Sequence, residues 1–125
     1  MTGRLTLTVV TGDPTPPYEQ LRRQLTGLIR HGALAAGDRL PPVRQLAADL
    51  GLAAGTVARA YRELEAAGLV ESRRGVGTRV AAAAEPVDPG RHRAVLHERA
   101  AGFVREARLL GATDDEIQAS ITKAL

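Results

Sequence analysis

The chain has 125 residues, of which 44% are hydrophobic and 25% charged, so it is long enough for one small globular domain or one domain with an appendage. This composition excludes the disordered and membrane classes, and the absence of cysteine excludes disulfides, thiolate metal sites and thiol catalysis. The net charge is +3, and residues 16–80 carry a local balance of +4, against −2 for 81–90 and +1 for 91–125. Such an uneven distribution is typical of a protein with one polyanion-binding part.

No apolar run approaches the roughly 18 residues that can span a bilayer. The first residues also lack a basic and then apolar leader that ends in a cleavage site. We therefore expect a soluble, cytoplasmic protein that has no membrane partner.

The N-terminal part predicts an arm followed by a helix. Residues 4–10 alternate apolar and polar side chains, as a β-strand or an extended arm packed along one edge does. The prolines of residues 11–17 indicate a loop, and Thr15 is a candidate N-cap for a helix from about Pro17 to His31. Gly32 ends this helix, whose expected buried stripe consists of Tyr18, Leu21, Leu25, Leu28 and Ile29.

Two shorter helices are predicted between residues 40 and 68, from apolar residues spaced i, i+3, i+4, i+7. Gly51 separates them and Gly68 ends the second, since glycine tolerates the positive φ of a helix end. The two stripes are Val43, Leu46, Ala47 and Leu50, and then Val57, Ala60, Tyr61 and Leu64.

A basic hairpin is predicted to follow these helices. The β-suited segment LVES leads into a turn with Gly75 and Gly77, and TRV closes the hairpin. A short strand around Arg39–Leu40 is placed to pair with it. Two helices joined by a tight glycine turn are the sequence form of a helix-turn-helix, and the hairpin makes it a winged one. We expect this unit, with an arm over residues 1–15, to occupy residues 1–80.

The rest of the chain predicts a proline-stiffened linker over residues 81–90 and a helical segment over residues 91–125. The first helix of this segment, from about Arg91 to Leu110, has an apolar seam with heptad spacing. A capping box at Thr113–Glu116 begins the second helix. Two helices cannot enclose a core, so we expect a homodimer; the alternative is that they fold back on the winged domain. The expected interface residues are Leu96, Ala100, Phe103, Ala107, Leu110, Ile117 and Ile121.

The segments PTPPYEQLRRQLTGLIRHGALAAGDRLPPVRQLAADLGL and TVARAYRELEAAGLVESRRGVGT resemble the DNA-binding domain of GntR-type bacterial transcription regulators. The tail FVREARLLGATDDEIQ resembles the YtrA subfamily, so the likeness covers residues 5–125. It implies a mainly helical, winged-helix fold and a homodimer that binds double-stranded DNA at a palindromic operator, usually as a repressor. The tail of this subfamily serves mainly to dimerise, and its members often lie beside genes for ABC transporters.

The resemblance also assigns DNA-binding residues. It places Arg44 at the start of the first motif helix, Thr56 near the start of the recognition helix, and Arg59 on the outer face of that helix. Helical periodicity adds Gly55 and Arg62, which with Arg59 point away from Val57. The guanidinium of Arg59 can bridge guanine O6 and N7 in the major groove, and Arg62, one turn further on, is expected to meet phosphate. The assigned wing residues are Arg73, Arg74, Gly75, Gly77 and Thr78.

This chain departs from the family pattern at the start of the recognition helix. Ala53, Ala54 and Gly55 stand where relatives have a capping Ser or Asn followed by Arg or Pro and a polar residue, and Ala58 replaces a frequent arginine. We therefore expect less direct base readout here and a closer approach of the helix to the groove.

Several other residues have simpler interpretations than DNA contact. Arg22, Arg23 and Arg30 fit solvated helix surface, Tyr18, Tyr61 and Phe103 fit packing, and Arg62 fits either phosphate contact or solvent.

Other functions fit the sequence less well. The carboxylates of residues 114–116 suit a helix first turn, and no nucleophile with a base and no phosphate-binding loop is visible, so we expect no enzyme. His92 and His97 do not share a helix face, and we expect no metal and no cofactor. Two alternatives remain. The chain could be a fragment of a larger regulator, which the capped helix pair at its end disfavours. It could also be a pure protein-interaction module, which, unlike a regulator, would show no salt-dependent DNA binding. No effector is indicated.

Overall fold

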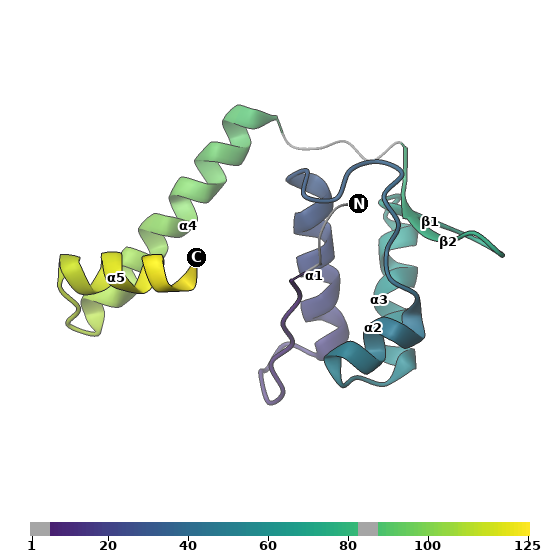
Figure 1. Ribbon diagram of the computed structural model, residues 1–125, viewed down its shortest axis with the longest axis horizontal. Coiled ribbons are helices and arrows are strands. Elements are labelled where there is room, and N and C mark those ends of the chain that lie inside the picture. The colour runs from purple at the N-terminus through teal and green to yellow at the C-terminus, as the bar shows by residue number, and fades with distance from the viewer. Residues whose placement is uncertain (1–5, 83–87) are drawn as a thin grey trace. The chain divides into compact units, whose positions relative to one another are not determined.

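The computed structural model describes residues 6–82 and 88–125. Their helices are α1 (Pro17–Arg30), α2 (Val43–Leu50), α3 (Ala54–Ala66), α4 (Pro89–Leu109) and α5 (Asp114–Ala124), and their strands are β1 (Val70–Arg73) and β2 (Gly77–Val80). The chain divides into two compact units, Met1–Val87 and Asp88–Leu125. The mainly helical fold with a small β wing is confirmed (Figure 1).

The first unit packs α1, α2 and α3 around one apolar core. Helix α3 contacts both α1 and α2 and leads into β1, so it is the central element of the unit. The predicted stripes supply most of this core because residues three and four apart share a helix face. The buried core residues are Leu21, Leu25, Ile29, Leu34, Leu40, Leu46, Ala47, Val57, Ala60, Tyr61, Leu64, Leu69, Val70 and Val80.

The turn between α2 and α3 depends on one left-handed glycine. Gly51 has φ +68°, and it turns the chain so that the N–H of Leu52 donates to the carbonyl of Ala47 at 2.8 Å. Because a side chain at this φ is strained, the helix-turn-helix geometry requires glycine here. This confirms the role that the sequence predicted for Gly51.

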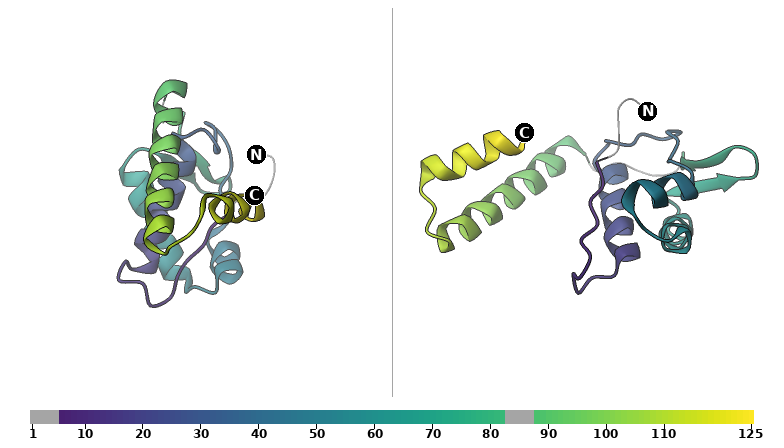
Figure 2. Two further views of the ribbon diagram at one scale, coloured as in Figure 1. Left: turned by 90° about the vertical axis from the view of Figure 1, so that its left-hand side faces the viewer. Right: turned by 60° about the horizontal axis from the view of Figure 1, so that its bottom comes forward.

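The wing is an antiparallel hairpin extended by a short third segment. The register of β1 and β2 runs from Val70↔Val80 to Arg73↔Gly77, and Arg39 bridges Arg79 on the other edge of β2, as the sequence predicted. The hairpin projects beyond the helices of its unit (Figure 2), so its exposed turn is free to reach a partner.

The N-terminal arm lies along α1 without forming a strand. The side-chain amide of Gln24 accepts from the N–H of Thr8 at 2.9 Å and donates to its carbonyl, and Gln20 bonds both backbone groups of Val10 in the same way. The extended-arm alternative is therefore correct for residues 6–10; residues 4 and 5 lie outside the described part of the chain. Thr15 is not the N-cap of α1 as expected, because Pro16 occupies that position.

The second unit is a pair of helices. α4 begins at Pro89, two residues before the expected start, because the carboxylate of Asp88 accepts the N–H of Arg91 and caps it. The expected linker over residues 81–90 is also shorter at its other end, since Ala81 is buried and bonds to Leu69; residues 83–87 lie outside the described part. The predicted capping box at Thr113 and Glu116 is present.

Candidate nucleic-acid interface

The start of α3 is exposed and lacks a side-chain cap. Ala53 is the N-cap residue and makes no side-chain cap hydrogen bond, and Ala53, Ala54 and Gly55 are exposed, so the positive end of the helix dipole faces solvent. A Cβ at Gly55 would meet nothing within 4 Å, and Gly55 has a helical φ. The fold therefore does not require glycine at this position, and the free space is available to a bound partner. Thr56 is half-buried beside it.

Arg59 lies at the edge of α3 that faces α1, although helical periodicity predicted that it points freely outward. Its Nε donates to Oε2 of Glu63 at 3.2 Å, and its guanidinium lies 3.7 Å from the centre of the Tyr18 ring. The side chain is still 54% exposed. A planar guanidinium has five N–H donors, so its outer nitrogens remain available to an acceptor. Tyr18 and Glu63 thus hold Arg59 in one orientation.

A second pair of charges continues this contact between α1 and α3. Arg22 donates to Glu19 within α1, and its Nε lies 3.9 Å from Oε1 of Glu63. The hydrogen bond from Arg22 lowers the pKa of Glu19. Arg23 is also within ion-pair distance of Glu19, at 3.6 Å. Arg22 and Arg23 are therefore occupied within α1 and its contact with α3, in keeping with their interpretation as helix surface.

Four predicted DNA-binding arginines have no such compensation. Arg44 on α2, Arg62 on α3, and Arg73 and Arg74 on the wing are all exposed. Within residues 6–82 and 88–125, none of them forms a salt bridge. Among the described residues Arg62 forms no salt bridge with Glu65, whose carboxylate accepts the N–H of Ser72 at 2.9 Å. These arginines give their surfaces an uncompensated positive charge.

The wing turn is built from two glycines with positive φ. Gly75 has φ +79° and Gly77 has φ +88°, and between them Val76 is exposed at the tip. Only glycine adopts such angles without strain, so this turn brings the backbone close to any partner. Thr78 lies one residue further along β2, where its hydroxyl is 3.0 Å from that of Ser72 on β1.

Sequence reasoning missed two arginines on the wing and the two residues that hold Arg59. Arg39 and Arg79 face one another across the third segment of the sheet, and the pairing predicted for Arg39–Leu40 was the signal that could have found them. No local signal could have assigned Tyr18 its contact with Arg59, because the two residues come from different helices.

The predicted dimer residues fall into two groups. Ala107 on α4 and Ile117 on α5 are each only 6% exposed, and both border one hollow that α4 and α5 line together. The structure therefore covers these two without any partner. The others remain on the surface of the unit, and a hollow beside α5 is bordered by Phe103, Leu110 and Ser120. The exposed members of the predicted set are Leu96, Ala100, Phe103, Leu110 and Ile121.

Neither a metal cluster nor a membrane span is found in the described part of the chain. No three of its His, Asp and Glu side chains are grouped so that they could hold a metal ion. None of its helices is both long enough and apolar enough to cross a bilayer.

Comparison with known proteins identifies the family. The family model described as bacterial regulatory proteins, gntR family, matches residues 17–80, from the start of α1 to the end of β2. The chain is 45% identical over 107 residues to the HTH-type transcriptional regulator Rv1152 of Mycobacterium tuberculosis, and the alignment covers 86% of this chain and 84% of that protein. It is also 45% identical over 64 residues to the HTH-type transcriptional repressor YtrA of Bacillus subtilis, which covers 51% and 49% of the two chains.

Solved structures agree with this assignment. YtrA from Sulfolobus acidocaldarius, a GntR-family transcription factor, is similar with a TM-score of 0.56 and 28% identity over 94% of this chain and 95% of that one. The DNA-binding domain of AraR in complex with operator ORX1 is similar with a TM-score of 0.56 and 26% identity over 62% and 100%. The chain therefore belongs to the GntR family of bacterial regulatory proteins, where it resembles the YtrA type, and it is a DNA-binding transcriptional regulator rather than an enzyme.

Proposed function

We propose that the chain is a repressor that binds a palindromic operator as a homodimer. The observation that carries this proposal is the set of exposed arginines without salt bridges on α2, α3 and the wing. Within the described residues, Arg44, Arg62, Arg73 and Arg74 are uncompensated and belong to the helix-turn-helix and the wing. Charges of one sign gathered in this way are expected where phosphates bind.

Each element of the winged unit has a distinct role in the proposal. The first turn of α3 enters the major groove, where Gly55 permits a close approach and Thr56 and the free backbone N–H groups hold a phosphate oxygen. Arg59 presents its outer nitrogens to a guanine, a contact that discriminates by roughly 1–3 kcal/mol. Arg44 and Arg62 contact the backbone on either side.

The wing supplies contacts outside the major groove. The glycine turn brings Arg73 and Arg74 to the minor groove, where the negative potential is strongest if the groove is narrow. Gly75 and Gly77 allow the backbone of the turn to lie against the sugar-phosphate chain, and Thr78 supports the turn through the opposite strand.

The homodimer is proposed from the apolar surface of the second unit. Leu96 is 63% exposed, Leu110 is 88% exposed, and Phe103 and Ile121 are exposed with them. Large exposed apolar side chains on one pair of helices favour association, because a second copy of the chain would remove their surface from water. The two recognition helices of such a dimer would read two half-sites about one helical turn apart. Repression is proposed because the relative YtrA of Bacillus subtilis is a repressor.

Footprinting on the DNA upstream of the chain's own gene tests the proposal. We expect two protected half-sites related by inverted symmetry, with centres about 10 base pairs apart. Protection should weaken steeply as salt is raised from 50 to 200 mM, because each phosphate contact releases counterions. A single protected half-site, or protection that does not change with salt concentration, would contradict the proposed function.

A further inference from the structure

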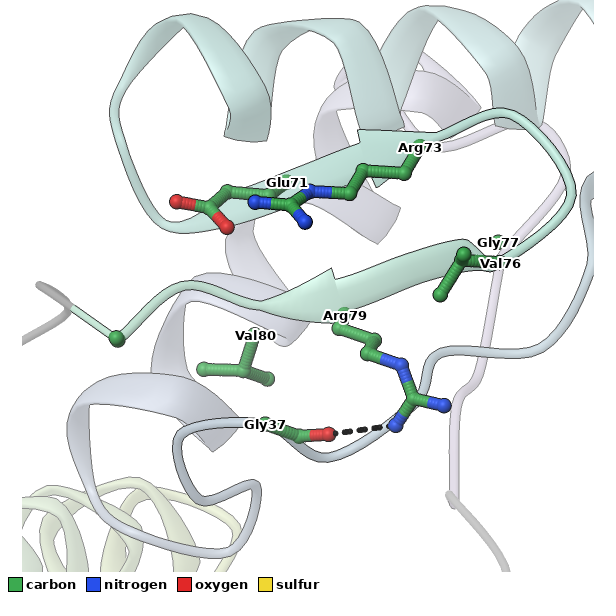
Figure 3. Close-up of a pocket in the computed structure, with 8 residues that line it drawn as sticks. Gly37, Glu71, Arg73, Val76, Gly77, Arg79 and Val80 are labelled. Carbon is green, nitrogen blue, oxygen red and sulfur yellow. Dashed lines mark hydrogen bonds between the residues drawn. The ribbon is translucent and has the colours of Figure 1, made fainter.

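One face of the wing sheet gathers three arginines. Arg39 and Arg79 pair directly across an antiparallel bridge, so their side chains leave the same face of the sheet. Glu71 on β1 is in register with Arg79, so it lies on this face as well. Arg73 comes two positions after Glu71 on the same strand and therefore shares the face. We call these four residues the outer face of the wing. Figure 3 shows Glu71, Arg73 and Arg79 around a hollow.

The two facing arginines repel one another, and the fold holds them in place. Like charges directly opposite destabilise an antiparallel pair. The guanidinium of Arg79 nevertheless donates to the carbonyl of Gly37 at 3.0 Å, as the dashed line in Figure 3 marks, and that of Arg39 donates to the carbonyl of Val76 at 3.3 Å. Backbone carbonyls orient both groups but do not neutralise them.

No carboxylate of the described chain neutralises this pair. Among residues 6–82 and 88–125, neither Arg39 nor Arg79 forms a salt bridge, and Glu71 forms none either. The nearby carboxylate of Asp38 accepts the backbone N–H of Ala35 at 2.9 Å. With three arginines and one glutamate, the outer face keeps a net positive charge. A surface of this charge attracts anions from outside the chain.

We infer that the outer face of the wing binds a phosphate of the DNA backbone, held between Arg39 and Arg79. The inference rests on the proposed operator binding and extends it beyond the wing tip. Each anchored guanidinium uses few of its five N–H donors on the protein, so the others can donate to phosphate oxygens. Orientation by the carbonyls reduces the side-chain freedom that binding must remove. The contact positions the duplex and reads no base.

Salt titrations of DNA binding test the inference. Operator affinity is measured between 50 and 200 mM salt for the full chain and for Arg39→Gln, Arg79→Gln and Arg79→Lys. The control Arg30→Gln removes the same charge from an exposed residue at the end of α1. Thermal melts check folding, and the lysine variant keeps the charge if glutamine disturbs the hairpin.

We expect each glutamine variant to make the salt slope shallower by about 1 per chain. Over this fourfold change in salt, that corresponds to about a 3- to 4-fold smaller loss of affinity for each bound chain, and about a 12-fold smaller loss for the dimer. Arg79→Lys should keep most of the slope, and Arg30→Gln should keep all of it. Unchanged slopes in both glutamine variants, with steep binding by the wild type, would overturn the inference and leave the proposed function standing. A wild type that does not bind DNA would overturn both.

A free phosphate compound shares the chemistry of the DNA backbone, and a second measurement separates the two sources. Pyrophosphate is titrated into the free chain while the NMR signals of Gly37, Val76 and the Arg79 side chain are followed. We expect only weak shifts, because a lone anion lacks the other contacts of the duplex. Saturating shifts at micromolar pyrophosphate, together with unchanged salt slopes in the variants, would assign the site to a free anion and refute the assignment to DNA.

Discussion

Replacing Tyr18 by leucine should weaken base discrimination by Arg59 without changing non-specific DNA binding. The ring of Tyr18 lies under the Arg59 guanidinium at 3.7 Å, while Glu63 holds the Nε of the same group. Leucine keeps the apolar bulk of the side chain and removes the ring face that attracts the cation. The net charge of the chain does not change, so attraction to phosphates as a class stays the same.

The expected magnitude follows from the exposure of the contact. A cation–π contact at an exposed site is worth about 0.5–1 kcal/mol, and ordering a freed side chain on binding costs a similar 0.5–1.5 kcal/mol. Since Glu63 still restrains Arg59, we expect the lower part of this range, which is about a 2- to 5-fold loss of operator affinity. Arg59→Gln removes the whole contact and should lose about 5- to 150-fold, from the 1–3 kcal/mol of a guanine contact.

Fluorescence anisotropy with operator and scrambled duplexes measures the specificity ratio for each variant. Tyr18→Phe is the matched control, because it keeps the ring face and changes only the hydroxyl. We expect Tyr18→Leu to lower the ratio, and Tyr18→Phe and the wild type to share one value. If leucine and phenylalanine at this position give the same ratio, the ring does not position Arg59. If Arg59→Gln leaves the ratio intact, Arg59 reads no base at all.

Three further predictions concern other parts of the chain. Gly55→Ala should raise the free energy of unfolding, measured in urea, by about 0.5–1 kcal/mol, because alanine is favoured over glycine in a helix and its Cβ would meet nothing within 4 Å. The same variant should weaken operator binding, and undiminished binding would show that α3 does not approach the groove closely. Tyr61→Phe should lower the free energy of unfolding by about 1 kcal/mol, because the buried phenol donates to the carbonyl of Pro41 at 2.7 Å; burial raises the pKa of Tyr61, so this donor stays protonated at neutral pH. The backbone N–H of Thr113 lowers the pKa of Glu116 from its ordinary 4.5. The ionised cap therefore stabilises α5 fully above pH 4.5, and this stabilisation is lost as the pH falls through the lowered pKa. The melting temperature of Glu116→Gln should lack this acid dependence, and a dependence equal to that of the wild type would contradict the role of the cap.

The fold of the winged unit was predictable because its signals are local. Apolar residues three and four apart define the buried faces of α1, α2 and α3, and glycine is the residue that the turns at Gly51 and Gly68 require. The β-suited segment LVES and the basic glycine turn predicted the wing, and the short segment at Arg39 was correctly expected to pair with it. The inferences on the helices, the turns and the hairpin used only neighbours in sequence.

What sequence reasoning missed depends on contacts between distant segments. The direction of Arg59 could not be predicted, because a long side chain follows its partners, and Tyr18 belongs to another helix. The sequence left a strand and an extended arm open at Thr8, and the hydrogen bonds to the side chain of Gln24 on α1, 16 residues away, decide for the arm. A heptad seam also does not say which partner covers it, so burial of Ala107 within its own unit was not foreseen.

Sedimentation equilibrium of the chain with a duplex that carries its operator tests the central claim most directly. The claim is that two copies together place two recognition helices and two wings on one duplex. At 50 mM salt we predict a complex of two chains per duplex, and dissociation of that complex as salt is raised. A complex with one chain per duplex, or no complex at this ionic strength, would contradict the claim.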